Sequence, residues 1–182
     1  MRIRRLREAD ADAVLAIYAP VVRTTAISFE WDPPDADEMR RRIRALGAEH
    51  PWLGAEDVEG LAGYAHAGPW RARTAYRWNA EIGIYVAERA RGRGVGRALL
   101  AELLERLRSA GYAAALGGIA LPNPPSVALH EALGFVHVAT FPRAGFKFGA
   151  WHDVGFWRRE LAPAPGAPRP PEFPRAPDPL AP

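Results

Sequence analysis

The segment Arg91–Gly96, which reads Arg-Gly-Arg-Gly-Val-Gly, constrains the fold more than any other stretch of the chain. It follows the apolar run 82–86 and leads directly into residues 97–110, whose apolar positions recur at helical spacing. Alternating glycines at a strand-to-helix junction leave backbone N–H groups uncovered, and a helix N-terminus adds partial positive charge. With the charges of Arg91 and Arg93, these groups predict a site for a di- or triphosphate ligand.

Two common phosphate-binding motifs do not fit this loop. A Walker loop ends in Gly-Lys-Ser/Thr, whose hydroxyl holds magnesium, whereas this loop ends in Gly96-Arg97-Ala98. The dinucleotide fingerprint needs a third glycine three residues after the second and an acid about 20 residues on, and residue 111 is Gly. The pattern Arg-x-x-Gly-x-Gly after a strand is similar to the pyrophosphate loop of the GNAT superfamily of acetyl-CoA-dependent N-acetyltransferases. From the loop alone, a plain glycine-rich turn remains the alternative.

The composition is that of an ordinary globular domain. With 182 residues, 48% hydrophobic and 25% charged, the chain is long enough for one domain with a buried core. It has no cysteine and its five histidines show no ligand spacing, so we expect no metal. No apolar run approaches about 18 residues and none follows the basic N-terminus, so we expect neither a membrane span nor secretion. The cytoplasm is the expected location.

Arginine makes the chain basic, with a net charge of +3 and a pI near 9.7. Such a balance can indicate nucleic-acid binding. Here the arginines are spread along the chain and alternate with acidic residues in the expected helices, which is typical of a solvated surface. We therefore expect no nucleic-acid partner.

The apolar patterns predict a mixed α/β or α+β sandwich in a single domain. Strands are expected at 3–6, 52–56, 61–67, 80–86, 113–119, 136–141 and 154–161, and helices at 11–22, 35–46, 97–110 and 127–133. Residues 145–153 are predicted to join the last two strands. Nine of the 18 prolines fall in residues 162–182, so the domain is expected to cover 1–161 and to be followed by a proline-rich extended or disordered tail.

Longer segments resemble one branch of the superfamily, the phosphinothricin N-acetyltransferases. The similarity runs from about Ile3 to Leu161. Gly-Pro-Trp-x-Ala-Arg and Trp-His-Asp-Val-Gly-Phe-Trp are typical of this branch rather than of the superfamily as a whole. The similar segments are Tyr64–Tyr76, Ala80–Val86, Leu121–Asn123 with Ser126, His130–Phe135, Gly145–Lys147 and Trp151–Trp157.

The resemblance implies a GNAT-like central β-sheet, flanked by helices and splayed between its two middle strands, with acetyl-CoA as co-substrate. The pantetheine arm would lie along residues 84–86 and the pyrophosphate on the glycine loop. The branch also implies a homodimer, and we expect Trp151 and Trp157 to be exposed and to supply apolar surface for it. The expected cofactor-binding residues are Ile84, Tyr85, Val86, Arg91, Gly92, Arg93, Gly94, Val95, Gly96, Asn123 and Ser126.

Two residues are implied for the chemistry. Amine attack on a thioester needs a base, a donor to the oxyanion and a departing thiolate. Glu81 matches the base of the family, acting through water, and the backbone N–H near Ile84 would serve the oxyanion. His130 stands where most superfamily members have a Tyr, seven residues after Asn123, and is a candidate acid for the thiolate or a polar contact to the amino acid. The pattern alone also allows an ion-paired Glu81 and a structural His130.

Phosphinothricin carries a carboxylate and a methylphosphinate, and guanidinium suits both. Arg71, Arg73 and Tyr76 match the branch's loop over this pocket, although close relatives can have Lys in place of Arg71. Phe29 lies in an irregular connection between two helices, which either lines the pocket or only covers the sheet. Glu30 stands where relatives can have Arg, which would change the charge of a pocket wall. Methionine sulfoximine or methionine sulfone is the alternative substrate, and a non-catalytic acyl-CoA-binding module the alternative function.

Overall fold

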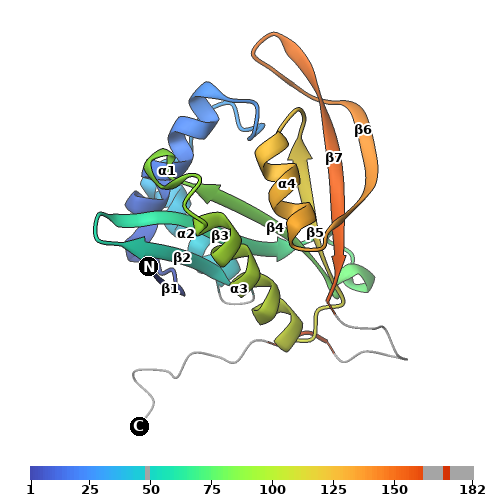
Figure 1. Ribbon diagram of the computed structural model, residues 1–182, viewed down its shortest axis with the longest axis horizontal. Helices are drawn as coiled ribbons and strands as arrows, with labels where there is room; N and C mark the ends of the chain where they lie inside the picture. The colour runs from blue at the N-terminus through green and yellow to red at the C-terminus, as the bar shows by residue number, and fades with distance from the viewer. Residues whose placement is uncertain (48–49, 162–169, 173–182) are drawn as a thin grey trace.

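A seven-stranded mixed β-sheet runs through the centre of the protein, in the order β1-β2-β3-β4-β5-β7-β6 (Figure 1). The computed structural model describes residues 1–47, 50–161 and 170–172. The strands are β1 (Arg2–Arg5), β2 (Trp52–Asp57), β3 (Gly60–Pro69), β4 (Asn79–Val86), β5 (Ala114–Ala120), β6 (Val136–Lys147) and β7 (Ala150–Glu160). The helices are α1 (Ala11–Thr24), α2 (Ala36–Gly47), α3 (Val95–Ser109) and α4 (Pro124–Ala132), with short 3-10 helices at Glu8–Asp10, Thr74–Tyr76 and Glu88–Ala90.

The sheet splays between its two central strands, β4 and β5. These two strands are parallel, whereas all the other neighbouring strands are antiparallel. Their register runs only from Asn79 with Ala114 to Ile82 with Gly117. Beyond this point β4 continues to Val86 and β5 to Ala120, so backbone groups of both strands face a gap. The predicted splayed GNAT-like sheet is confirmed.

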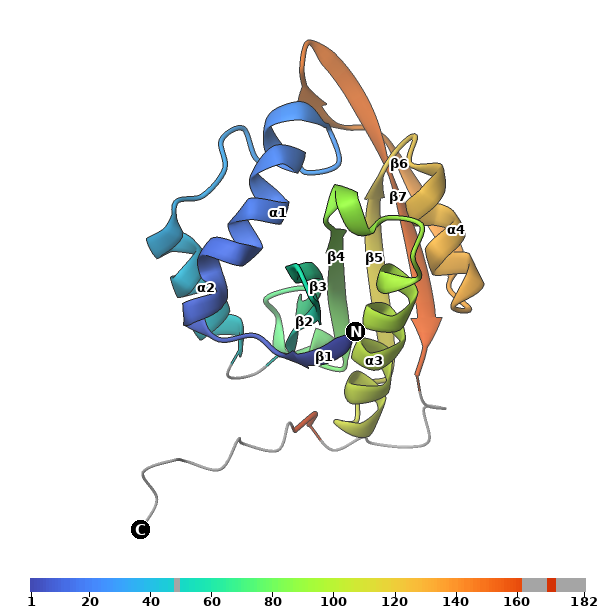
Figure 2. The ribbon, with the colours of Figure 1, turned by 60° about the vertical axis from the view of Figure 1, so that its left-hand side comes forward.

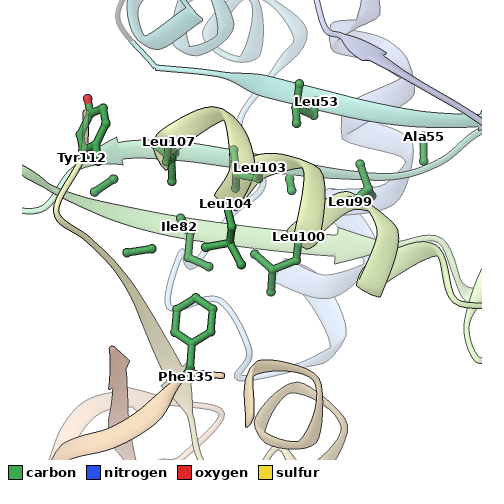
Figure 3. Close-up of a cluster of buried hydrophobic side chains, with 14 of the residues drawn as sticks. Leu53, Ala55, Ile82, Leu99, Leu100, Leu103, Leu104, Leu107, Tyr112 and Phe135 are labelled. Atoms are coloured by element: carbon green, nitrogen blue, oxygen red, sulfur yellow. The ribbon is translucent and has the colours of Figure 1, made fainter. Parts of the chain in front are cut away.

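Two helices lie against each face of the sheet (Figure 2). On one face, α3 turns a stripe of leucines toward β2, β3 and β4, and Phe135 joins this core from the chain after α4 (Figure 3). The stripe is Leu99, Leu100, Leu103, Leu104 and Leu107. On the other face, α1 and α2 bury Val14, Ile17, Tyr18, Met39 and Ile43 against Trp52 and Tyr64. Both stripes have the spacing of one helical face, so burial of apolar surface fixes which side of each helix meets the sheet.

The segment 145–153 is not the loop that the sequence predicts. β6 runs to Lys147 and β7 begins at Ala150, so the last two strands form one long hairpin that projects beyond the rest of the sheet (Figure 1). The two residues between the strands, Phe148 (φ 51°) and Gly149 (φ 74°), both have positive φ, as a tight two-residue hairpin turn requires. Gly145 lies inside β6 and Gly149 lies in the two-residue turn, so these glycines do not interrupt the hairpin.

Trp157 is buried, contrary to the expectation of an exposed aromatic. Its side chain is 5% exposed and packs in the core on the α3 side of the sheet. Its Nε1 also donates to Glu131 of α4 (3.2 Å). Alternate residues of a strand face opposite sides of a sheet, which places Trp157 in the core. Trp151, in the projecting part of the hairpin, is 60% exposed as expected.

Most of the predicted tail, residues 162–169 and 173–182, lies outside the described residues. In the short described part, the Glu172 amide donates to the Ala110 carbonyl just after α3 (2.9 Å). Within the described ranges, no helix is both long and apolar enough to cross a membrane.

Candidate active site

A cavity of about 650 Å³ lies at the splayed end of the sheet. Four parts of the chain line it: the end of α1 with the loop that follows, the end of β4, the glycine loop with the start of α3, and the start of α4. Among the residues predicted to bind the cofactor, all of which the structure describes, only Arg93 does not line the cavity, and its side chain is exposed. The others, Ile84, Tyr85, Val86, Arg91, Gly92, Gly94, Val95, Gly96, Asn123 and Ser126, all line the cavity.

The glycine loop is shaped by three glycines with different tasks. Gly92 (φ +71°) and Gly94 (φ +80°) adopt left-handed conformations, and a Cβ on either would meet no atom within 4 Å. Gly94 is the N-cap of α3, which therefore begins at Val95, two residues earlier than predicted. A Cβ on Gly96 would lie 3.3 Å from Leu129 Cδ2, so this glycine lets α3 approach α4 closely. The loop thus has open space beside Gly92 and Gly94, where side chains would otherwise cover its backbone.

The start of α4 adds a second helix N-terminus to the cavity. Asn123 is the N-cap, and its side-chain oxygen accepts a hydrogen bond from the Ser126 amide (3.3 Å). Pro124 and Pro125 occupy the first turn, where a helix tolerates proline because the N–H is not needed there. Both helix dipoles and the side chains of Arg91 and Arg97 therefore favour an anion in this cavity.

Glu81 faces the α1 side of the sheet. Tyr85, four residues later in β4, packs in the core on that side, and residues at even spacing along a strand share a face. A Cβ on Gly118 of β5 would lie 3.6 Å from Glu81 Oε1, so the carboxylate lies over the Gly118 backbone. Among the described residues, no Lys, Arg or His nitrogen forms an ion pair with it. Burial raises the pKa of the half-buried Glu81 carboxyl, and the charge of Arg71 partly offsets this.

His130 lies on the opposite face of the sheet. Its side chain is 3% exposed, packs edge-on against Phe135, and has its ring over Gly117 of β5. Its Nδ1 lies 2.8 Å from the Ser126 carbonyl, which can only accept, so Nδ1 carries the hydrogen and Nε2 of the neutral ring is an acceptor. Burial lowers the pKa of His130, and the Ser126 carbonyl partly offsets this.

The loop between β3 and β4 brings a cation to Glu81. The Arg71 guanidinium stacks on the Trp70 ring (3.9 Å to its centroid) and donates to the Trp70 carbonyl (3.0 Å). Trp70 in turn packs edge-on against Phe156, whose ring flanks Gly118. Two other predicted substrate residues are exposed: Arg73, which precedes the short helix Thr74–Tyr76, and Tyr76, which ends it.

Phe29 packs against the β6–β7 hairpin on the Glu81 face of the sheet. Its ring occupies the space that a Cβ on Gly145 would take and lies 6.1 Å from the His152 ring. His152 and Phe156 are four residues apart in β7 and share a face, and Phe156 flanks Gly118 on the Glu81 side. Phe29 therefore belongs to the same side of the molecule as the carboxylate.

Glu30 does not present a free charge to this side of the protein. Its carboxylate pairs with Arg42 of α2 (2.6 Å) and accepts a hydrogen bond from the Tyr18 hydroxyl (3.1 Å). The negative charge is thus compensated inside the protein, and the expected change of charge at a pocket wall is largely cancelled.

Sequence reasoning missed several residues that line the cavity. Arg97 and Pro125 adjoin predicted residues, so extending each motif by one helical turn finds them. Val21, Thr25 and Ile27 come from a distant part of the chain, and the periodicity of α1 gives no sign that its end reaches a cavity. The missed set is Val21, Thr25, Ile27, Ala90, Arg97, Pro125 and Leu129.

Comparisons with known proteins agree with this geometry. A family model described as "Acetyltransferase (GNAT) domain" matches residues 3–155. A phosphinothricin N-acetyltransferase of Streptomyces viridochromogenes is 43% identical over 171 residues, which are 93% of this chain and 92% of the relative. An L-methionine sulfoximine/L-methionine sulfone acetyltransferase of Pseudomonas aeruginosa is 37% identical over 168 residues, 91% of this chain and 98% of the relative. The crystal structure of a GNAT superfamily phosphinothricin acetyltransferase from Sinorhizobium meliloti in complex with AcCoA superposes with a TM-score of 0.87 at 36% identity, covering 98% of this chain and 97% of that chain.

Proposed function

The chain belongs to the GNAT acetyltransferase family, and we propose that it moves the acetyl group of acetyl-CoA to the amino group of phosphinothricin or a close amino-acid analogue. One observation carries the proposal. The end of β4, beyond its pairing with β5, lines a cavity together with two helix N-termini and two arginines, and Glu81, a carboxyl with a raised pKa, lies in the last paired stretch of β4 before the strands part.

The cavity fits acetyl-CoA as co-substrate. We assign the pyrophosphate to the backbone N–H groups of the glycine loop, with Arg91 and Arg97 adding charge. The pantetheine arm is assigned to the end of β4, residues 84–86, whose backbone groups face the gap and can pair with the amides of the arm. This arrangement points the thioester toward the place where β4 and β5 separate.

The chemistry follows from which proton must move. An amino acid arrives as an ammonium and attacks only after losing a proton, which Glu81 accepts directly or through a water. A raised pKa suits this task, because it brings the carboxylate closer in basicity to the working pH. A backbone N–H near Ile84, on the edge of β4 that faces the gap, is assigned to the oxyanion that forms on the acetyl carbon, and the C–S bond then breaks as the CoA thiolate leaves.

His130 is assigned to the leaving sulfur, on the other face of the sheet. Because burial lowers its pKa, the ring is neutral near pH 7 and presents the Nε2 lone pair. A neutral ring must first gain a proton before it can give one to the thiolate. His130 is therefore expected to work as a relay rather than as an acid charged beforehand: Nε2 receives the second proton, which the attacking nitrogen loses once its bond to the acetyl carbon has formed, and passes it to the thiolate.

Two arginines favour an acceptor with anionic groups. Arg71 lies close enough to Glu81 to oppose its pKa shift, and Arg73 is in the same exposed loop. Guanidinium groups suit both the carboxylate and the phosphinate of phosphinothricin. Methionine sulfoximine or sulfone is the second candidate, because one relative carries that name and the side chain of such an acceptor needs only hydrogen-bond donors.

The test is CoA release measured with acetyl-CoA and a panel of amines. Phosphinothricin, methionine sulfoximine, methionine sulfone and methionine form a graded series, from an anionic to an apolar side chain. The highest kcat/KM is expected on phosphinothricin. A higher value on the sulfone would favour the second candidate, and binding of acetyl-CoA without CoA release on any amine would contradict an enzyme of this class.

We also propose a cytoplasmic homodimer, joined through the projecting hairpin. β6 is the edge strand of the sheet, and apolar side chains stand exposed along the hairpin: Val136, Val138, Phe141, Phe146, Phe148 and Trp151. Trp151→Glu should convert the dimer to a monomer in sedimentation velocity. Val58→Glu, at a fully exposed valine in the turn between β2 and β3, is the control and should leave the dimer intact. A monomeric wild-type protein would contradict the proposal.

A further inference from the structure

Lys147 is the single lysine of the chain, although lysine and arginine together number 24. It stands at the end of β6 and is 1% exposed. Taking an ammonium out of water is unfavourable unless its hydrogen bonds are restored inside the protein. The contacts of this one buried cation therefore indicate what the hairpin holds in place.

The ammonium binds backbone carbonyls from the N-terminal half of the chain. Nζ donates to the carbonyls of Val22 (2.6 Å) and Ser28 (2.7 Å). It also lies 4.9 Å from the centroid of the Phe148 ring, within range of a cation–π interaction. No carboxylate of the described residues forms an ion pair with it. The lysine is thus a clamp on the backbone rather than half of a salt bridge.

The two carbonyls belong to the end of α1 and to the loop that follows it. Val22 lies in the last turn of α1, where carbonyls lack helical partners and the helix dipole favours a cation. Ser28 is in the loop 25–35, which has no helix or strand of its own. Its hydroxyl also bonds to the Tyr18 hydroxyl (2.8 Å). One ammonium thus joins the loop to the last turn of the helix from which it departs.

The same loop touches the hairpin next to the clamp. Phe29, directly after Ser28, packs over Gly145 and beside His152. His152 Nε2 in turn lies 3.1 Å from the Lys147 carbonyl, which fixes the backbone of the clamp from the opposite strand. The position of the Phe29 ring therefore depends on where Lys147 holds the Ser28 carbonyl.

We propose that Lys147 is a positioning residue for the acceptor site: it fixes the loop so that Phe29 forms one wall beside the Glu81 face. The inference rests on the proposed acetyltransferase function, since Phe29 matters only if an amino acid binds there. A lysine suits this task better than an arginine, because its compact ammonium reaches two converging carbonyls that a flat guanidinium would push apart.

The first test is Lys147→Met, which keeps the length of the side chain and removes the donors. The KM of the acceptor should rise by about tenfold or more, and the KM of acetyl-CoA by less than that, because Thr25 and Ile27 of the same loop form only part of the cavity lining; kcat should change by less than about threefold. Arg23→Met is the matched control, because Arg23 is an exposed cation one residue from Val22 and should leave all three constants unchanged. An unchanged acceptor KM in Lys147→Met would overturn the inference while leaving the proposed function intact.

Two readouts do not need turnover, so they separate this inference from the proposed function. Hydrogen exchange at the amides of Thr25, Ile27 and Glu30, which all have partners in the wild-type protein, should speed up by about tenfold in Lys147→Met but not in Arg23→Met. Unchanged exchange would contradict the clamp even if the wild-type enzyme acetylated none of the amines.

The second readout uses the wild-type protein, so it tests the inference even if Lys147→Met fails to fold. An amine-reactive ester can modify only Lys147 and the α-amino group of this chain. In the folded protein Lys147 should react at least about a hundredfold more slowly than in urea, and CoA plus phosphinothricin should slow it further. Labelling of Lys147 as fast as in urea would overturn the proposal, and this outcome does not depend on whether phosphinothricin binds.

Discussion

Glu81→Gln is the substitution that tests the proposed chemistry most directly. Glutamine keeps the size of the side chain and its position over Gly118, but it cannot accept a proton from the ammonium. Removing a general base lowers kcat by about 10²–10⁴. The structure favours the middle of this range or above, because His130, the other residue assigned to the chemistry, lies on the opposite face of the sheet, and His66, on the Glu81 face, is stacked on Trp52 and has its pKa lowered to about 4 by burial. We expect a loss of about 10³ in kcat, equivalent to about 4 kcal/mol of transition-state stabilisation.

The pH profile adds a signature that belongs to this carboxylate. Burial raises the pKa of Glu81 above its ordinary value of 4.5, and Arg71 opposes the shift. The base works only when ionised, so kcat/KM of the wild-type enzyme should rise with pH along a limb displaced upward from that value. Arg71→Gln should move the limb to higher pH, because it removes the charge that favours the carboxylate. Glu81→Gln should lose this limb and keep only the part that belongs to the substrate amine.

The free energy of unfolding of Glu81→Gln distinguishes a loss of catalysis from a loss of folding. A carboxyl whose pKa is higher in the folded than in the unfolded protein binds its proton more tightly when folded, so the free energy of unfolding falls as pH rises between the two pKa values. At neutral pH the ionised Glu81 therefore destabilises the wild-type protein. Glu81→Gln removes this effect and should be at least as stable in urea denaturation.

The opposite pattern would refute the assignment. If Glu81→Gln kept more than about a tenth of the wild-type kcat with an unchanged pH profile, the base would lie elsewhere. A variant that lost activity together with its cooperative unfolding transition would show that Glu81 is needed for folding rather than for proton transfer.

Three further substitutions probe separate parts of the protein. Gly94→Val should raise the KM of acetyl-CoA far more than that of the amine, because it strains a backbone at φ +80° and covers N–H groups beside the cavity. Gly60→Val is the control, because its backbone (φ +106°) is strained in the same way but Gly60 is not among the residues that line the cavity. Arg73→Ala should raise the amine KM by about ten- to a hundredfold, the loss of one charge-assisted hydrogen bond, with little change for acetyl-CoA; an effect on acetyl-CoA instead would place this arginine at the cofactor. Burial lowers the pKa of His66 to about 4, so the unfolded chain takes up a proton first as the pH falls below 6.5. The wild-type protein should therefore lose about 3 kcal/mol of unfolding free energy between pH 6.5 and pH 4, and His66→Phe, which keeps the ring stacked on Trp52, should lose less; equal slopes in urea titrations would contradict this assignment.

The parts of the fold that the sequence predicted are those encoded by local patterns. The leucine stripe of α3 follows from helical spacing, and the glycine loop follows from its place between a strand and a helix. Position in such motifs also identified most of the residues that line the cavity. Each of these features depends on residues close together in the chain, so a single sequence contains the information.

The features that the sequence missed all depend on contacts between distant segments. Nothing near Val21 shows that the end of α1 meets the glycine loop. The sequence near Trp157 does not show that its side chain is buried. Only the register of β7 with β5 places it on the core side of the sheet. The charge of Glu30 is compensated by Arg42 from the next helix. The sequence predicts a loop in place of the long hairpin because glycines stand near Lys147.

Two consecutive glycines in β5 explain how one gap can serve groups on both faces of the sheet. Gly117 is the last β5 residue paired with β4, and Gly118 is the next. A Cβ on Gly117 would lie 2.7 Å from His130 Nε2, and one on Gly118 would lie 3.6 Å from Glu81 Oε1, because neighbouring residues of a strand point to opposite faces. Glycine weakens a strand, yet here its lack of a side chain lets both groups reach the backbone where the strands part. In the proposed reaction the amine then enters from the Glu81 face and the sulfur leaves toward the His130 face, so attack and departure occur on opposite sides of one thioester.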